Sequence, residues 1–190
     1  MTLGERAKFK VILERHKILF DGKLGLYPHE KFHLQLKEGA IPVHKKPYPV
    51  PYKRREVFQS ELNSLVKEGV LKHCGMTNWA APTFIIPKGD NTVRWVSDFR
   101  ELNKVLERPK YPIPRIGDIM LKQRGYNHFT KIDLSMMFYC FALDDASKEL
   151  CTIITPFGKY QYQRLPMGIK ASPDFACLLY TSDAADERLG

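Results

Sequence analysis

One aspartate, Asp133, stands where a carboxylate could serve phosphate chemistry. It follows Phe-Thr-Lys-Ile at 129–132, a segment with the composition of a strand, and precedes Leu-Ser. Carboxylate oxygens at the end of a rigid strand are ligands that Mg²⁺ prefers. Two such ions, roughly 3.5–4 Å apart, can stabilise the attacking and leaving oxygens of a phosphoryl displacement. Asp133 could therefore bind a metal ion, but taken alone it is as well explained as an ordinary strand-end aspartate that accepts loop amide protons.

Two cationic side chains flank a predicted hairpin upstream of this aspartate. Lys88 begins the turn Lys-Gly-Asp-Asn at 88–91, and Arg94 lies in the predicted strand 93–98. A planar guanidinium matches phosphate oxygens, and a lysine supplies a compact charge. The pair could hold a triphosphate, or both could be solvated hairpin residues.

Three spaced blocks carry a resemblance to a known family. They read Val-Arg-Trp-Val-Ser-Asp-Phe-Arg-Glu-Leu-Asn-Lys at 93–104, Phe-Thr-Lys-Ile-Asp-Leu-Ser at 129–135, and Leu-Pro-Met-Gly-Ile-Lys-Ala-Ser-Pro at 165–173. In this order and spacing they resemble the reverse transcriptase of retroelement polyproteins, especially the Ty3/gypsy class of LTR retrotransposons. The resemblance covers residues 3–176. It implies an RNA-directed DNA polymerase that adds dNTPs to a primer 3′ hydroxyl on an RNA or DNA template by a two-metal mechanism.

The resemblance also implies roles around Asp133. This residue would be the first metal-binding and catalytic aspartate, and Leu134 would add its backbone carbonyl. Phe138 would exclude a 2′ hydroxyl, because a flat ring leaves no room for the extra oxygen. Relatives commonly carry a glycine just before this aromatic, whereas this chain has Met137 there. Tyr139 is therefore the alternative candidate.

The other two blocks would contact nucleotide and template. The implied nucleotide-binding residues are Lys88, Arg94, Leu134, Phe138, Met167 and Gly168; the implied template-binding residues are Asp98, Arg100, Asn103 and Pro173. Arg100 would contact a template phosphate and Asp98 would orient it, or the two would form a purely structural pair. Gly168 would permit a close backbone approach.

Hydrophobic periodicity and turn residues predict the elements that position these residues. Helices are predicted at 4–19, along the apolar stripe from 58 to 66 that stops at Gly69, at 115–123, and from a Ser172 N-cap onward; strands are predicted at 31–36, 81–87, 93–98, 128–133, 138–143, 150–155 and 160–165. Four prolines make 41–52 extended. This is an α+β pattern. The family counterpart is a right-hand polymerase, divided into a linker helix region at 1–30, fingers at 31–128, partial palm at 129–176 and a tail at 177–190.

The end of the chain departs from the family pattern. Relatives carry a downstream Tyr-x-Asp-Asp, which this sequence lacks; Asp144 and Asp145 are predicted as a solvated turn. Residues 177–187 resemble the conceptual translation of a transposase adapter used for sequencing libraries, so we expect the natural sequence to diverge after Ala176. We expect fingers and partial palm, truncated before the Tyr-x-Asp-Asp hairpin and inactive alone. A non-catalytic nucleic-acid-binding relic is the alternative, and a basic domain without a nucleic-acid role is a third hypothesis.

Composition is compatible with these partners. The 190 residues carry a net charge of +9, which favours phosphate-bearing partners without identifying one. Four cysteines form no Cys-x-x-Cys pair, so a zinc site is not indicated. The resemblance implies Mg²⁺, with Mn²⁺ as an alternative. It also implies template–primer, dNTPs and the rest of a polyprotein (remaining palm, thumb, RNase H, protease and integrase) as partners, and no membrane. We expect an intracellular location, in a cytoplasmic particle or the nucleus.

Overall fold

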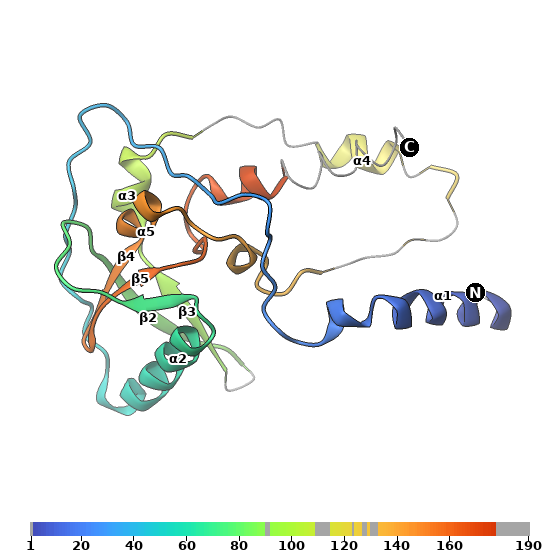
Figure 1. The fold of residues 1–190 in the computed structure, drawn as a ribbon, viewed down its shortest axis with the longest axis horizontal. Coiled ribbons are helices and arrows are strands. Elements are labelled where there is room, and N and C mark those ends of the chain that lie inside the picture. The colour runs from blue at the N-terminus through green and yellow to red at the C-terminus, as the bar shows by residue number, and fades with distance from the viewer. Residues whose placement is uncertain are drawn as a thin grey trace.

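Within the described residues, runs of helices and runs of strands follow one another along the chain, and the strands form one sheet (Figure 1). The computed structural model describes residues 2–89, 92–108, 115–122, 124–126, 129 and 133–177. Its elements are α1 (Leu3–Arg15), η1 (Lys17–Phe20), η2 (Tyr52–Arg54), α2 (Arg55–Lys67), β1 (Leu71–His73), β2 (Ala81–Pro87), β3 (Val93–Ser97), α3 (Arg100–Val105), α4 (Ile116–Lys122), η3 (Met137–Cys140), α5 (Asp145–Leu150), β4 (Thr152–Thr155) and β5 (Gly158–Tyr162). In these ranges we find no helix with the length and apolar character needed to cross a membrane. The predicted α+β class is confirmed.

The five strands lie in the order β1-β5-β4-β2-β3. β2 pairs antiparallel with β3 and parallel with β4, while β5 pairs antiparallel with β4 and β1. The first three strands belong to the predicted fingers range 31–128, and the last two belong to the predicted palm range 129–176. The two ranges therefore share one sheet, and the boundary between them stays a prediction.

The β2–β3 hairpin matches the predicted strands 81–87 and 93–98 to within one residue. Side chains alternate along β3, with Trp95 and Ser97 buried and Arg94 exposed between them and the turn. This period of two is what a sheet with one covered face requires. Residues 90 and 91 of the predicted turn lie outside the described ranges.

α2 covers the sheet through the apolar stripe that the sequence predicts. Phe58, Leu62 and Leu65 are buried, and the Phe58 ring centroid lies 4.8 Å from that of Trp95. Gly69 has a φ of +71°, a conformation that favours glycine, so the helix ends where predicted.

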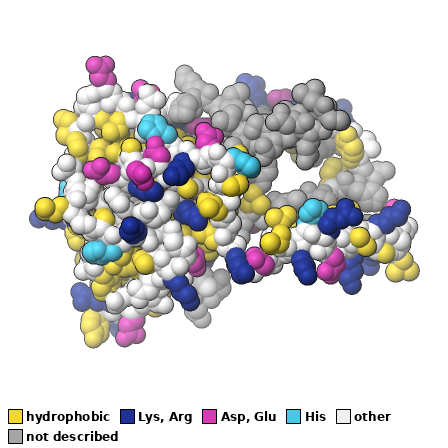
Figure 2. Space-filling view, in the orientation of Figure 1, with side chains coloured by type: hydrophobic (Ala, Val, Ile, Leu, Met, Phe, Trp, Pro, Cys, Tyr) yellow, Lys and Arg dark blue, Asp and Glu magenta, His cyan; other side chains and the backbone are white. Residues whose placement is uncertain are grey.

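α1 forms without burying any side chain. Thr2 and Glu5 build a capping box: the Thr2 hydroxyl accepts the Glu5 amide at 3.3 Å, and Glu5 accepts the Thr2 amide at 2.6 Å. The predicted helix 4–19 is confirmed as α1 followed by η1. Figure 1 shows both extending away from the sheet, and Figure 2 shows Lys and Arg side chains along α1 with apolar side chains between them. Local capping, not packing, therefore stabilises α1.

The strand predicted at 138–143 is wrong. The aromatic-rich run instead begins with the 3₁₀-helix η3, in which the Tyr139 amide donates to the Met136 carbonyl at 2.9 Å. Met136 precedes it with φ 51° and ψ 32°, a left-handed conformation that turns the chain before a strand can start. Only isolated pairings at Ala142 and Leu143 remain of the expected strand.

Three further predictions meet mixed outcomes. The segment 31–36 alternates as predicted, with Phe32 and Leu34 buried, but it forms isolated pairings instead of a regular strand. Asp144 is the N-cap of α5 and not part of a solvated turn, because its carboxylate accepts the Ser147 amide at 2.8 Å. Most of the strand predicted at 128–133 lies outside the described residues.

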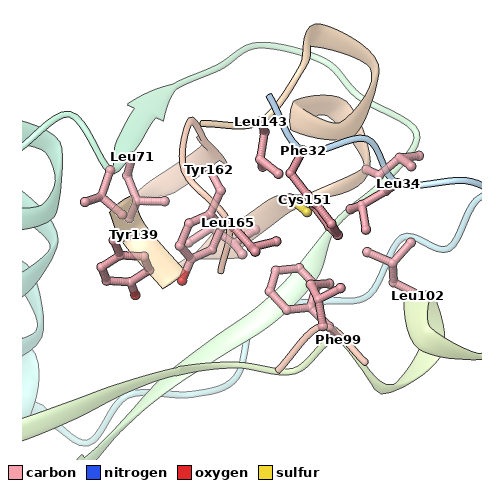
Figure 3. Packing of buried hydrophobic residues seen from close by; sticks show 14 of the residues in the cluster. Phe32, Leu34, Leu71, Phe99, Leu102, Tyr139, Leu143, Cys151, Tyr162 and Leu165 are labelled. Carbon is pink, nitrogen blue, oxygen red and sulfur yellow. The ribbon is translucent and has the colours of Figure 1, made fainter. Parts of the chain in front are cut away.

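The core gathers side chains from both ends of the chain. Figure 3 shows Phe32 and Leu34 facing Phe99 and Leu102, with Cys151 and Leu165 between the two sides. The segment that contains Phe32 and Leu34 therefore helps to bury α3 against the sheet.

Candidate nucleic-acid and nucleotide site

Asp98 directly follows β3 and forms the centre of a polar cluster. Its carboxylate accepts Nε and Nη2 of Arg100 at 2.8 and 2.7 Å. The Tyr48 hydroxyl donates to the same carboxylate at 2.9 Å. The Asp98 amide donates to the Pro82 carbonyl at 2.9 Å. Asp98 thus joins the proline-rich strip and the start of α3 through its carboxylate, and β2 through its backbone amide.

These hydrogen bonds set the charges of the cluster. The bonds from Arg100 hold the pKa of Asp98 well below its usual range, against the opposing effect of burial. The pKa of Arg100 is in turn raised by the bonds to Asp98. The Arg100 side chain is 80% exposed, whereas that of Asp98 is 13% exposed. A shielded carboxylate thus orients a solvent-facing guanidinium, an arrangement suited to phosphate; the template role of both residues stays a prediction.

Asn103 on α3 joins the first sequence block to the third. Its Nδ2 donates to the Gly168 carbonyl at 2.7 Å, and its Oδ1 accepts the Lys170 amide at 2.8 Å. Gly168 has a φ of +94°, and a Cβ there would lie 3.6 Å from the Ser97 carbonyl. The turn therefore approaches the end of β3 in a conformation that favours glycine. Asn103 positions this turn, which exposes Met167, and its amide is fully engaged with backbone.

An ion pair holds the helical segment that begins at residue 172. The prediction that Ser172 is the N-cap is wrong, because residue 172 is already helical. Its Oγ instead donates to the Pro166 carbonyl at 3.3 Å. Asp174 is 3% exposed and accepts Nε and Nη2 of Arg108 at 2.6 and 3.1 Å. Pro173, predicted to lie near the template, is exposed between these buried neighbours. The pair joins this segment to the residues that follow α3.

The two hairpin cations both face solvent. Lys88 and Arg94 are exposed, and the Lys88 amide closes the hairpin by donating to the Thr92 carbonyl at 2.8 Å. Burial and the charge of Glu68 raise the pKa of Glu61 on α2, and the charge of Lys88 acts in the opposite direction. The Lys88 ammonium is thus within electrostatic reach of Glu61 on α2, and it makes no hydrogen bond or ion pair within the described part of the chain.

Asp133 and Leu134 lie in an exposed part of the chain, with Leu134 45% exposed. Within the described ranges, the Asp133 side chain makes no hydrogen bond or ion pair, and no three His, Cys, Asp or Glu side chains are grouped to hold a metal ion. Mg²⁺ is usually bound through one or two carboxylates plus substrate phosphates. Asp133, with the Leu134 carbonyl, therefore fits as one part of such a site.

η3 separates the two candidates for sugar recognition. Tyr139 is 5% exposed, and its ring centroid lies 6.2 Å from that of Tyr162. Phe138 is half-buried at the edge of the core. The left-handed residue is Met136, one position before Met137. Of the two aromatics, only Phe138 retains a partly open face for a ligand.

Tyr48, Arg108 and Asp174 belong to the site, but sequence reasoning gave none of them such a role. The bond of Tyr48 spans 50 residues along the chain, and that of Arg108 spans 66. No local periodicity can report such distant pairs. For Asp174, the one available signal is its position near the start of a predicted helix, which favours an acidic residue through the helix dipole and reveals no partner.

Comparison with known proteins extends these observations. A family model described as "Reverse transcriptase (RNA-dependent DNA polymerase)" matches residues 86–185. The uncharacterized protein K02A2.6 of Caenorhabditis elegans is 33% identical over 174 residues, covering 89% of this chain and 14% of the relative. The retrovirus-related Pol polyprotein from transposon 412 of Drosophila melanogaster is 31% identical over 150 residues, covering 76% of this chain and 12% of the relative. The chain thus spans a small part of the curated relatives it matches.

Solved structures share the fold. The protease–reverse transcriptase of prototype foamy virus superposes with a TM-score of 0.81 at 23% identity, covering 98% of this chain and 25% of that chain. The foamy viral protease–reverse transcriptase in complex with an RNA/DNA hybrid gives a TM-score of 0.76 at 21% identity, with the same coverage. The arrangement described above is therefore that of the fingers and part of the palm of these polymerases.

Proposed function

Because the chain belongs to the reverse transcriptase (RNA-dependent DNA polymerase) family, we propose that it forms the template-holding and part of the nucleotide-binding surface of a retrotransposon polymerase. The complete enzyme would add dNTPs to a primer 3′ hydroxyl on an RNA or DNA template. This chain would supply the fingers and the first metal ligand of the palm.

The observation that carries the proposal is the continuity between two sequence blocks. Asp98 orients the exposed Arg100 guanidinium, and Asn103 holds the turn that presents Met167 and Gly168 beside it. Arg100 and Asn103 both belong to α3, so the proposed template cation and the turn proposed to face the nucleotide are anchored to one short helix. Such preorganisation is what positioning a template against a nucleotide demands.

The remaining roles follow from the exposed residues around this surface. Asp133 and the Leu134 carbonyl would hold Mg²⁺, or Mn²⁺, which would stabilise the attacking and leaving oxygens of nucleotide transfer. Lys88 and Arg94 would bind the triphosphate as solvent-facing cations. Phe138 would press on the sugar and reject a 2′ hydroxyl by steric conflict.

Partners follow from the same premise. The Drosophila relative is named a Pol polyprotein, and one foamy viral structure is titled a complex with an RNA/DNA hybrid. We propose template–primer and dNTPs as ligands, and the remaining polymerase, RNase H, protease and integrase segments as covalent partners. An intracellular location, in a cytoplasmic particle or the nucleus, is part of the proposal.

The first experiment recovers the complete reading frame by sequencing the source locus across the codons for residues 170–190. Primer extension is then measured for the complete polymerase, its Asp133→Asn variant and the 190-residue chain. We expect extension by the complete polymerase, a loss of about 1,000-fold or more in the variant because a metal ligand has gone, and none by the 190-residue chain. Extension by the short chain, or full activity of Asp133→Asn, would contradict the proposal.

A second experiment addresses template binding by the chain itself. Fluorescence anisotropy of a labelled RNA/DNA hybrid at several salt concentrations gives the slope of affinity against salt. Arg100→Ala should lower the magnitude of this slope by about one, since one phosphate contact is lost. Arg55→Ala, at the exposed start of α2, is the matched control and should leave the slope unchanged. Equal slopes for wild type and Arg100→Ala would remove Arg100 from the template surface.

A further inference from the structure

A groove with a volume of about 430 Å³ lies between the segment that precedes the proline-rich strip and the residues that follow α3. None of the described residues that line it has a nucleotide or template role in the proposal above. Its volume falls within the range of sites that hold small organic ligands, roughly 300–1,000 Å³. The groove is therefore a candidate site for a further ligand.

One wall of the groove comes from alternate residues of an extended segment. Phe32 and Leu34 point into the core (Figure 3). The residues between and after them, His33, Gln35 and Lys37, are exposed and line the groove. The His33 ring is oriented, because its Nδ1 lies 2.6 Å from a carboxylate oxygen at the N-cap of α5. This wall presents an imidazole ring, an amide and an ammonium in a row.

The opposite wall contains Arg108 and repeats the Asp98–Arg100 arrangement. In both places the carboxylate accepts Nε and Nη2 of the arginine. The Asp174 side chain is 4% exposed, whereas that of Arg108 is 52% exposed. Nη1 of Arg108 makes no hydrogen bond within the described residues. A buried carboxylate thus holds a partly exposed guanidinium at the groove, an arrangement that suits an anion.

Further positive charge gathers at this end of α3. The Lys37 ammonium donates to the Lys104 carbonyl at 2.8 Å, which leaves it two further donors. The Lys170 ammonium donates to the Leu106 carbonyl. Burial lowers the pKa of Lys170, and the charges of Lys37 and Arg108 lower it further. Like charges this close repel one another, so an anion bound among them would be stabilised.

The carboxylates near the groove differ in whether they already have partners. Asp174 is bound to Arg108, and Asp144 accepts the Ser147 amide beside its contact with His33. Glu107 is exposed and is the acidic residue among the described residues that line the groove. Its charge opposes an anionic ligand, so neutralising it should favour one.

An unpaired nucleotide matches this combination of groups. The cations suit its phosphate, and the floor, formed by Phe32, Leu34 and Ala171, suits the carbon atoms of a base. The oriented His33 ring offers a face on which the base can stack. In a duplex the bases are stacked inside, so only an unpaired nucleotide presents base and phosphate together. Proteins that bind single strands combine a positive groove with stacking side chains in this way.

We propose that this groove binds one nucleotide of a single-stranded nucleic acid, with its phosphate on Lys37 and Arg108 and its base between His33 and the apolar floor. Asp174 is the positioning residue that holds Arg108. The site goes beyond the proposed function, in which Arg100 holds the template–primer, and neither depends on the other.

The test measures fluorescence anisotropy of the 190-residue chain with a labelled oligothymidine of about twelve nucleotides, long enough for one site. The first variant combines Arg108→Ala with Asp174→Asn, so that no unpaired carboxylate is left buried. We expect the affinity to fall roughly three- to tenfold, and the magnitude of its salt slope to fall by about 0.7, because one phosphate contact is lost. Lys37→Gln should act in the same direction, and Glu107→Gln should tighten binding.

Lys31→Gln is the matched control, because Lys31 is exposed on the same segment but is not among the described residues that line the groove. Its affinity should equal that of wild type. A blunt RNA/DNA hybrid of the same length is the second control, and the groove variants should bind it as wild type does. An equal loss for Lys31→Gln, or an equal loss on the hybrid, would reduce the effect to general charge and overturn the inference.

Arg100→Ala in the same assays separates the inference from the proposed function. If it lowers the salt slope for the hybrid while the groove variants bind the single strand as wild type does, the groove is wrong and the proposed function stands. If the groove variants weaken binding and Arg100→Ala leaves the hybrid slope unchanged, the groove stands and the template role of Arg100 is wrong. Thermal unfolding identifies a double variant that fails to fold, and Lys37→Gln then decides.

Discussion

The template side and the metal side of the proposed site are built differently. On the template side, Asp98 is bonded to Arg100 and to Tyr48, and Asn103 is bonded to distant backbone, by hydrogen bonds of 2.7 to 2.9 Å. On the metal side, the Asp133 side chain is exposed and makes no hydrogen bond or ion pair with the rest of the described chain. One half of the site is fixed in advance, and the other is free to take ligands.

The difference teaches which contacts each half needs. A phosphate contact works best when the cation is held still before the template arrives, because ordering it afterwards costs conformational entropy. A metal-binding carboxylate needs free lone pairs, and its order can come from the ion and its other ligands. Substitutions should therefore lower stability on the template side and leave it unchanged on the metal side.

The largest effect on stability is expected from Arg108→Ala. It leaves the Asp174 carboxylate, which is 3% exposed, without its partner, so the free energy of unfolding should fall by more than in any of the variants below. Urea unfolding followed by circular dichroism measures this. The double variant Arg108→Ala with Asp174→Asn should recover much of the loss; a single variant as stable as wild type would show that the ion pair contributes nothing.

Asn103→Ala should lower the free energy of unfolding by about 2 kcal/mol, because two backbone groups of the 168–170 turn lose their partner. The same unfolding measurement applies. Lys104→Ala on the neighbouring exposed face is the control and should change stability by less than about 0.5 kcal/mol. If both variants lose equally, the helix and not the turn is the affected element.

Asp98→Asn should lower the free energy of unfolding by about 1 kcal/mol at pH 7 and leave it unchanged in strong acid. The pKa of Asp98 is depressed in the folded chain. The stabilisation that ionised Asp98 provides is therefore fully present above its pKa of about 4 in the unfolded chain. It is lost as the pH falls through the lower pKa of the folded chain. Unfolding of wild type and variant should be compared from pH 7 to 3. A difference between them that grows on acidification would contradict the assignment.

Met136→Gly should stabilise the chain by roughly 0.5–1 kcal/mol, because glycine adopts the left-handed conformation without steric cost. Met137→Gly, placed inside η3, should destabilise it by a similar amount. Opposite signs in thermal unfolding support a strained turn before η3, whereas equal losses for the two variants would show that Met136 is not strained.

The smallest effect is expected on the metal side. Asp133→Asn should change the unfolding free energy by less than about 0.5 kcal/mol, since the side chain has no partner to lose within the described residues. A loss as large as that of Asn103→Ala would erase the contrast between the two sides.

The sequence predicted best where structure is local. The hairpin 81–97 and the stripe of α2 follow from alternation, from a period of 3.6 and from turn residues that lie within a few positions. α3 was missed because six residues are too short for a periodic signal. η3 was taken for a strand because Phe138, Tyr139 and Phe141 have strong β-propensity, and the left-handed turn at Met136 overrides it.

The candidate site shows the same contrast between residues that the sequence predicts and residues that only the tertiary structure reveals. The family pattern assigned Asp98, Arg100 and Asn103 to the template and Gly168 to the nucleotide; the structure pairs Asp98 with Arg100 and joins Asn103 to Gly168, while the assigned roles stay predictions. The side chains that hold them, Tyr48 and Arg108, come from segments whose approach depends on the tertiary fold. Residues that contact a ligand can thus be found from a family pattern, whereas the residues that position them need coordinates.

The parallel pairing of β2 with β4 has a consequence for synthesis of the protein. β4 lies between β5 and β2, and residues 81–82 pair with residues 153–154. A nascent chain that has left the ribosome through β3 holds a finished hairpin and α2, but the centre of its sheet is still missing. The apolar faces of β2 and α2 therefore stay exposed to solvent until β4 and β5 have been synthesised. During that interval the fingers are an open target for chaperones and proteases.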